Sequence, residues 1–162
     1  MRRKQTHVYL ATGIAIFLLG LSCIRTTPIF AQEASNPQTN PHFAAALSRL
    51  DQKDLQGAMQ ELNQAILLDP SLADAYSLRA ILHLDNKNYQ KALVDFTEVT
   101  RLRPQSAEAY VNLAKSQLVF KDYRAALQSA TKATQLEPQN QNALLLVQLI
   151  QRILESSGMV EK

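Results

Sequence analysis

The sequence has no tryptophan, one cysteine and only four glycines, and each scarcity excludes a class of protein. A single cysteine cannot form an intramolecular disulfide, so the chain is not a disulfide-stapled domain. Beyond residue 31 only Gly57 and Gly158 remain, which excludes a glycine-rich phosphate loop and a Gly-x-Ser-x-Gly nucleophile turn. The three histidines are scattered and have no Cys, Glu or second His at ligand spacing. We therefore expect no catalytic residue, cofactor, metal site or small-molecule substrate.

Acidic residues are absent from one end of the chain. The whole chain carries 17 Lys and Arg against 14 Asp and Glu, with a pI of about 9.1. Residues 1–31 hold four of the basic residues and no acid, which leaves 13 basic against 14 acidic residues in 32–162. The body is nearly neutral and lacks the stripe of Lys and Arg that phosphate neutralisation requires, so we expect no nucleic-acid partner.

Residues 1–31 have the organisation of an export signal. A basic start precedes an apolar run from Val8 to Leu21, and Ala31 is a small residue at the expected cut. Two alternatives stay open: residues 8–24 could be an uncleaved membrane anchor, or Cys23 could be lipidated as in bacterial lipoproteins. All three place the rest of the chain outside the cytoplasm, so we expect a periplasmic or secreted protein of bacterial origin, or one anchored to the membrane. The small, polar residues 32–40 are expected to be a flexible spacer.

An internal repeat of 34 residues runs through the body. Pro70, Pro104 and Pro138 are 34 residues apart. Units with such a period are typical of repeat proteins, and three units, 39–72, 73–106 and 107–140, follow from it. The same period relates Ala46, Ala80 and Ala114; Leu50, Leu84 and Leu118; Ala58, Ala92 and Ala126; and Leu68, Leu102 and Leu136.

Each unit is predicted to be a pair of helices, because apolar residues recur at helical spacing in two segments. Asp54, Asn88 and Asp122 precede the second helices, where a side-chain oxygen can cap free N–H groups. Ser71 to Asp74 predicts a capping box that opens the first helix of the second unit. The repeated prolines end the second helices. Since one hairpin cannot bury its own apolar face, the hairpins should stack into an all-α solenoid.

The units resemble the tetratricopeptide repeat (TPR) family, whose pattern is an aromatic, Leu-Gly, Tyr, and later Ala, an aromatic and Pro. The resemblance covers roughly residues 39–140 and implies a right-handed superhelix of helix hairpins that works as a protein-binding scaffold. It does not imply catalysis. The second unit matches best, the third next, and the first is weakest. The matching residues are Tyr76, Arg79-Ala80, His83, Ala92, Phe96 and Pro104; Tyr110, Leu113-Ala114, Gln117, Ala126, Ala130 and Pro138; and His42, Ala45-Ala46, Arg49, Ala58, Leu62 and Pro70. His42 and His83 therefore occupy positions of core-packing aromatics.

The resemblance also implies a concave groove lined by the first helix of each unit. An apolar floor with acidic edges suits an amphipathic, somewhat basic protein segment or peptide. The family's clamp for chaperone C-terminal carboxylates uses Lys, Asn and Arg, and here only Asn112 has a matching polar type, so that clamp is not expected. The residues predicted to bind the partner are Phe43, Leu47, Asp74, Leu78, Ile81, Glu108, Val111, Asn112 and Lys115.

Residues 141–157 are predicted to form a helix that caps the third repeat. Its apolar arc is wider than a half-buried helix needs, because Leu145, Leu149 and Ile153 extend the stripe that packs inward. Either the helix is deeply packed, or these residues form a homodimer or partner contact. The sequence thus predicts an exported, non-catalytic scaffold, with a membrane-tethered assembly factor for an envelope complex or pilus as the alternative. Contact with a membrane follows only if the leader is retained or Cys23 is lipidated.

Overall fold

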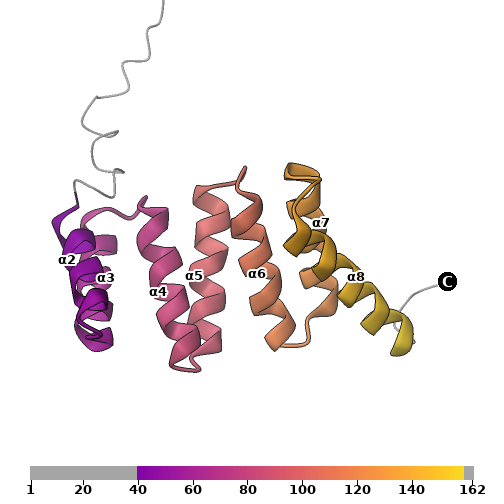
Figure 1. Cartoon of the computed structure of the whole chain (residues 1–162), viewed down its shortest axis with the longest axis horizontal. Helices are drawn as coiled ribbons and strands as arrows, with labels where there is room; N and C mark the ends of the chain where they lie inside the picture. Colours follow the sequence, from indigo (N-terminus) through magenta and orange to yellow (C-terminus); the bar gives the residue numbers. More distant parts are fainter. Residues whose placement is uncertain (1–39, 159–162) are drawn as a thin grey trace, which may run out of the picture.

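The computed structural model describes residues 40–158, and within this range the chain forms helices and no strands. The predictions for the leader, 1–31, and for residues 32–39 of the spacer lie outside the described residues. The helices follow one another in a single row from α2 to α8 (Figure 1). They are α2 (Pro41–Asp51), α3 (Leu55–Leu68), α4 (Ala73–Asp85), α5 (Tyr89–Leu102), α6 (Ala107–Val119), α7 (Tyr123–Leu136) and α8 (Gln141–Ser156).

The helices pack as three hairpins, α2 with α3, α4 with α5 and α6 with α7, and each hairpin also packs against the next. The last helix, α8, lies against both α7 and α6. This arrangement confirms the all-α solenoid predicted from the 34-residue period. Within residues 40–158 no helix is both long and apolar enough to cross a lipid bilayer.

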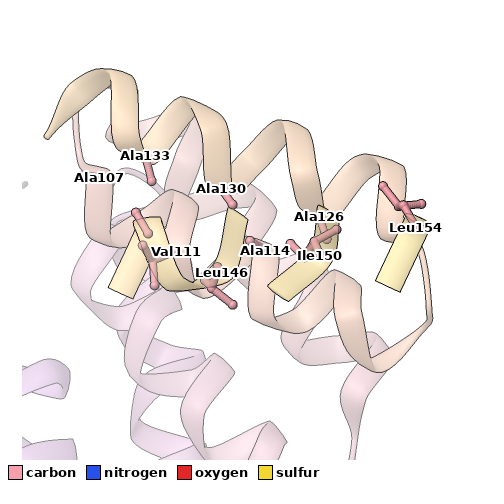
Figure 2. Close-up of a cluster of buried hydrophobic side chains, with 10 residues drawn as sticks. Ala107, Val111, Ala114, Ala126, Ala130, Ala133, Leu146, Ile150 and Leu154 are labelled. Carbon is pink, nitrogen blue, oxygen red and sulfur yellow. The ribbon is translucent and has the colours of Figure 1, made fainter. Parts of the chain in front are cut away.

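Three separate cores hold the hairpins together. Alanines at the hairpin contacts, among them Ala80 and Ala92 in the second hairpin, are fully buried, and their small side chains allow the two helices to approach closely. Figure 2 shows the core of the third hairpin, in which Leu146 and Ile150 of α8 point at the alanines of α6 and α7. The cap helix therefore completes the core of the third hairpin.

Aspartates cap two of the second helices as expected. Asp54 accepts a hydrogen bond from the Gly57 backbone N–H at 2.9 Å, and Asp122 accepts one from Ala125 at 3.2 Å. Asn88 stands at the same place before α5 but its side chain makes no capping bond. Each second helix ends two residues before its proline, as predicted.

The predicted capping box at the start of α4 is wrong. The residue at the N-cap is Leu72, which has no side-chain oxygen to offer. Ser71 instead donates its hydroxyl to Asp69 at 2.6 Å, in the turn that follows α3. Asp74 does not take part in capping α4 either, because its carboxylate pairs with Arg103. The two residues therefore serve the loop and the neighbouring hairpin rather than the helix end.

The turns inside the three hairpins share one conformation. Lys53, Lys87 and Lys121 each have a left-handed backbone, with φ of 61°, 58° and 58°. The N–H of each lysine bonds back three residues and the N–H of the next residue bonds back five, which is the Schellman ending of a helix. Glycine is the usual residue at this point, so each hairpin holds a lysine in a conformation that L-residues disfavour.

Asn40 belongs to the folded unit and not to the spacer in which the sequence placed it. It is buried, its Oδ1 accepts from the Phe43 N–H at 3.0 Å, and its Nδ2 donates to the Ala65 carbonyl at 3.1 Å. The side chain therefore caps α2 and ties it to the end of α3.

Candidate protein-binding groove

Equivalent residues of the repeats are compared by repeat position, counted from residues 39, 73 and 107. The surface made by positions 2, 5, 6, 9 and 13 of the first helices α2, α4 and α6 is called the groove face. The nine predicted binding residues all lie in these three helices. They differ in exposure, which decides what a partner could touch.

Leu47 and Ile81 are the apolar residues that the groove face offers to solvent. Both occupy position 9, in α2 and α4, and they are 45% and 46% exposed. Lys115 follows at the same position of α6 and is exposed as well. Leu78, at position 6, is half-buried and packs against the core of the first hairpin. Position 9 therefore forms a row of two apolar residues and one cation.

Two of the predicted residues are not on the surface. Phe43 is 8% exposed and Val111 is 4% exposed, because both sit at position 5 and are packed inside cores. Ser77, at the same position of α4, is half-buried. A large apolar side chain at position 5 turns into the space between hairpins, where its burial stabilises the stack. The groove floor is thus narrower than the sequence pattern predicts.

A hollow of about 130 Å³ opens between α4 and α6. Four of the predicted residues line it, namely Asp74, Ile81, Glu108 and Asn112. Ser77, Val99, Arg103, Ser106 and Ala109 complete its lining. The structure therefore brings together those predicted residues that face each other across the second and third units.

One acid of this hollow already has a partner. Arg103, just past the end of α5, donates to both carboxylate oxygens of Asp74, at 2.6 and 2.8 Å. The pair is partly exposed, so it stabilises the fold only slightly. Glu108 is exposed and makes no ion pair with any residue that the structure describes. Glu108 is thus the acid of this hollow that a cationic partner can reach.

The residues proposed for self-association lie on α8 with unequal exposure. Leu145 is 62% exposed and Leu149 50% exposed, whereas Ile153 is half-buried. The opposite side of the helix, with Ala143, Leu146, Ile150 and Leu154, is buried against the third hairpin. The helix is therefore packed on one side and apolar on part of the other.

Sequence reasoning missed a polar contact that recurs within each hairpin. Position 23 of each second helix is polar and bonds to the first helix of its own hairpin. Glu61 contacts His42 Nδ1 at 2.8 Å, Asp95 pairs with Arg79, and Ser129 donates to Gln117 Oε1 at 2.8 Å. The partners stand at positions 4, 7 and 11, which lie along one side of a helix. Comparing the three units at position 23 is the signal that could have revealed these contacts.

The contact between Arg79 and Asp95 lies beside two hollows lined by α4 and α5, the first of which also reaches α3. Arg79 donates to both oxygens of Asp95 at 2.7 and 2.8 Å, and also to Asn63 at 2.9 Å. The hollows, of about 400 and 440 Å³, share Arg79 and Asp95 in their walls. Hydrogen bonding to Asp95 raises the pKa of Arg79 above its already high value. Both charged groups are thus engaged with each other.

The two histidines of the repeats differ in their surroundings. His42 is not a core residue as predicted, because its side chain is 42% exposed and contacts Glu61. Burial lowers the pKa of His83, and its Nδ1 is buried without a hydrogen-bond partner. Within residues 40–158 no three His, Cys, Asp or Glu side chains are grouped so that they could hold a metal ion.

Comparison with known proteins agrees with the repeat pattern. The tetratricopeptide repeat family model matches residues 73–106 and 107–140, the second and third units. None of the curated proteins matches the sequence significantly.

Solved structures with the same fold have low sequence identity. The first TPR of Spaghetti (RPAP3) bound to the HSP90 peptide SRMEEVD has 18% identity and a TM-score of 0.66, covering 77% of this chain and 95% of its own. The second TPR domain of human RPAP3 in complex with the HSP70 peptide SGPTIEEVD has 19% identity and a TM-score of 0.63, covering 72% and 98%. The Sgt2 TPR domain from Aspergillus fumigatus has 18% identity and a TM-score of 0.66, covering 80% and 87%. The 34-residue period, the stacked hairpins and these matches together make the chain a tetratricopeptide repeat protein.

Proposed function

We propose that the protein is a non-catalytic scaffold of the cell envelope that binds a peptide or helix of another protein on its groove face. The mechanism is recognition by a preformed surface, in which the stacked hairpins fix the binding side chains and no bond is made or broken. The family as a whole supports a role in protein binding.

The observation that carries this proposal is the equal exposure of Leu47 and Ile81. Two hairpins present a large apolar residue at the same repeat position, beside a hollow that Glu108 and Asn112 border. Exposed apolar groups aligned along a hollowed face are typical of surfaces that receive amphipathic segments. Scattered surface leucines would not recur at one position.

The chemistry of this face differs from a clamp for C-terminal carboxylates. Two of the related structures contain HSP90 or HSP70 peptides, but at this level of identity they support only the fold. Where such a clamp needs cations and amides, this chain has Phe43, Leu47, Leu78 and Glu108. Phe43 is also buried, and a carboxylate near Glu108 would be repelled. A partner that is amphipathic and somewhat basic fits this face better.

The test is site-specific photo-crosslinking in the native cell. A photoreactive residue replaces Ile81 in the groove, and a matched control places it at Val94, an exposed apolar residue of α5. Support is a crosslinked protein obtained from position 81 and not from position 94, and lost when Glu108→Lys is added. Equal crosslinks from both positions would overturn the groove proposal. Asp74 is left unchanged, because its substitution would also break the pair with Arg103.

The envelope location has its own test. The leader proposal requires that the native protein begin after Ala31, as mass spectrometry of its N-terminus can establish. An intact leader or a lipid on Cys23 would favour the membrane-tethered assembly factor, and recovery of the unprocessed chain from the cytoplasm would overturn export.

A further inference from the structure

The exposed leucines of α8 fall at the repeat positions that form the groove face. Residue 141 follows residue 107 by 34, so α8 begins where the first helix of a fourth unit would begin. In this register Leu145 stands at position 5 and Leu149 at position 9. Leu149 is therefore the equivalent of Leu47 and Ile81, and its exposure closely matches theirs.

The helix α8 packs on the preceding hairpin with the same side that other first helices use. Position 3 is buried in α4, α6 and α8, and so is position 10. Helices that bury the same two positions against the preceding hairpin turn position 9 toward the same side, because the rotation per residue is fixed. The residues are Ala75, Ala109 and Ala143 at position 3, and Leu82, Ser116 and Ile150 at position 10. Leu149 therefore continues the groove face.

In the hairpins, position 8 of the first helix packs against the second helix, and this is not the side of α8 that carries Leu149. Position 8 is a fully buried alanine in each hairpin, where it meets the second helix, but in α8 it is Gln148, which is exposed. Gln151, at position 11, is exposed too. Polar residues thus occupy the surface where a further helix would pack. Leu149 is therefore not left over from a missing hairpin, because position 9 stays exposed in α2 and α4, which another hairpin follows. Leu145 stands at position 5, which is buried in α2 and α6, and it adds to the apolar surface beside Leu149 because no further hairpin covers it.

We propose that α8 is the fourth segment of the binding groove, and that its occupant is a segment of another protein that is cationic at one end and apolar at the other. This rests on the proposed function of the groove face. The apolar end lies over Leu145 and Leu149, and the cationic end lies over α2 and α4.

Charge complementarity decides the orientation. On the groove face, α2 and α4 carry only acids as their charged residues, namely Asp51, Asp85 and Asp74, of which Asp74 is already paired with Arg103. The equivalent positions of α8 carry no charge. Between them α6 contributes Glu108 and Lys115. Lys53 and Lys87 lie beyond the ends of α2 and α4, in the hairpin turns. A partner's cations are therefore attracted over the first two hairpins and find no partner over α8.

A second copy of this chain is the weaker occupant. A stable interface buries about 800 Å² on each partner, and two half-exposed leucines supply only a small part of that. On the groove face, the same leucines lie beyond Lys115 in the row that begins with Leu47 and Ile81, and they give that face a second apolar end.

Binding of a defined peptide to the full-length chain tests the proposal. The probe is an amphipathic peptide of about 20 residues, about 30 Å long as a helix. One version has lysines in its first half and leucines in its second half, another has the halves exchanged, and a third has glutamates for lysines. The variants are Leu145→Gln with Leu149→Gln in the groove, Ile81→Gln in α4, and the matched control Leu67→Gln with Leu68→Gln, which changes two exposed leucines of α3. Circular dichroism and sedimentation verify the fold and the oligomeric state.

We expect at least one lysine peptide to bind, and the α8 variant to weaken it about tenfold or more, since two apolar contacts are lost. The control variant should bind as the wild type does, and the glutamate peptide should bind more weakly.

If Ile81→Gln weakens binding while the α8 variant leaves it unchanged, the groove stands and its extension onto α8 is overturned. If neither variant weakens binding, or no lysine peptide binds, both proposals for this face fail. Loss of a dimer in the α8 variant with unchanged peptide affinity assigns the leucines to self-association and overturns the extension. Equal binding of the glutamate peptide overturns the charged half of the proposal.

Discussion

Arg79 and Asp95 form a two-point ion pair between α4 and α5, with N–O distances of 2.7 and 2.8 Å. Asp95 is only 3% exposed, so its charge depends on the guanidinium for its stability. The TPR pattern has leucine where Arg79 stands, and the third hairpin has Leu113 and Ser129 at the repeat positions of Arg79 and Asp95. An ion pair between positions 7 and 23 is therefore particular to the second hairpin among the three.

Arg79→Leu is expected to lower the free energy of unfolding by about 3 kcal/mol, because Asp95 remains buried without its partner. Denaturant unfolding followed by circular dichroism measures this loss. The double variant Arg79→Leu with Asp95→Ser copies the pair of the third hairpin and should recover most of the stability. A double variant that is no more stable than the single one would contradict this account.

His83→Gln should reduce the loss of stability on acidification. Burial lowers the pKa of His83 in the folded chain, opposed by Asp95 and assisted by Arg79 and Lys91. The unfolded chain then takes up a proton near pH 6.5 that the folded chain accepts only at lower pH. The contribution of His83 to stability is therefore present above about pH 6.5 and is lost as pH falls toward its folded pKa, by at most about 1.4 kcal/mol per pH unit.

The measurement is the free energy of unfolding at neutral and mildly acidic pH for both proteins. His42 is present in each and cancels in the difference. Glutamine is the residue at the same repeat position of the third hairpin, Gln117. An unchanged pH dependence in the variant would assign the effect to other groups.

Lys87→Gly should raise the free energy of unfolding by about 0.5–1 kcal/mol, because glycine adopts a positive φ without the steric cost that lysine bears. This gain exceeds the cost of glycine's greater flexibility in the unfolded chain. Thermal unfolding measures the change. Lys87→Val, which adds a β-branched side chain at the same φ, should lower the melting temperature. If glycine lowers it too, the turn is held by contacts of the lysine side chain.

Asn40→Ala should lower the stability by about 1–2 kcal/mol, because it removes both the cap of α2 and the bond to the Ala65 carbonyl. Asn140→Ala is the matched comparison, since Asn140 caps α8 through Ala143 and also donates to Glu137, but this second bond is exposed, whereas that of Asn40 to Ala65 is buried. We expect the loss from Asn140→Ala to be smaller. Equal losses in chemical denaturation would show that the buried bond to Ala65 contributes no more than the exposed bond to Glu137.

The fold could be predicted because its determinants are local and repeated. Pro70, Pro104 and Pro138 mark the helix ends, and the buried alanines keep the same spacing. The cap helix, predicted over 141–157, runs over Gln141–Ser156. Each of these signals involves residues close in the chain or one period apart, which a sequence displays directly.

The groove was predicted less well because its details depend on contacts between hairpins. Asp74 reads as a free acid until Arg103, 29 residues further on, is found beside it. Phe43 and Val111 share a repeat position with Ser77, and only packing between neighbouring hairpins decides which side chain is buried. Ser71 suits a capping box in isolation, yet Asp69 competes for its hydroxyl.

The polar contacts at position 23 have a consequence for errors during folding. Near-identical repeats can pair out of order, since their apolar surfaces are interchangeable. If α5 folded against α6 in place of α4, Asp95 would be buried opposite Leu113, without a cation at that position. If α7 folded against α4, Arg79 would face Ser129 and lose its carboxylate. The polar contact at position 23 therefore differs from hairpin to hairpin and favours pairing of each second helix with its own first helix. A chain whose helices pair one period out of register loses these contacts.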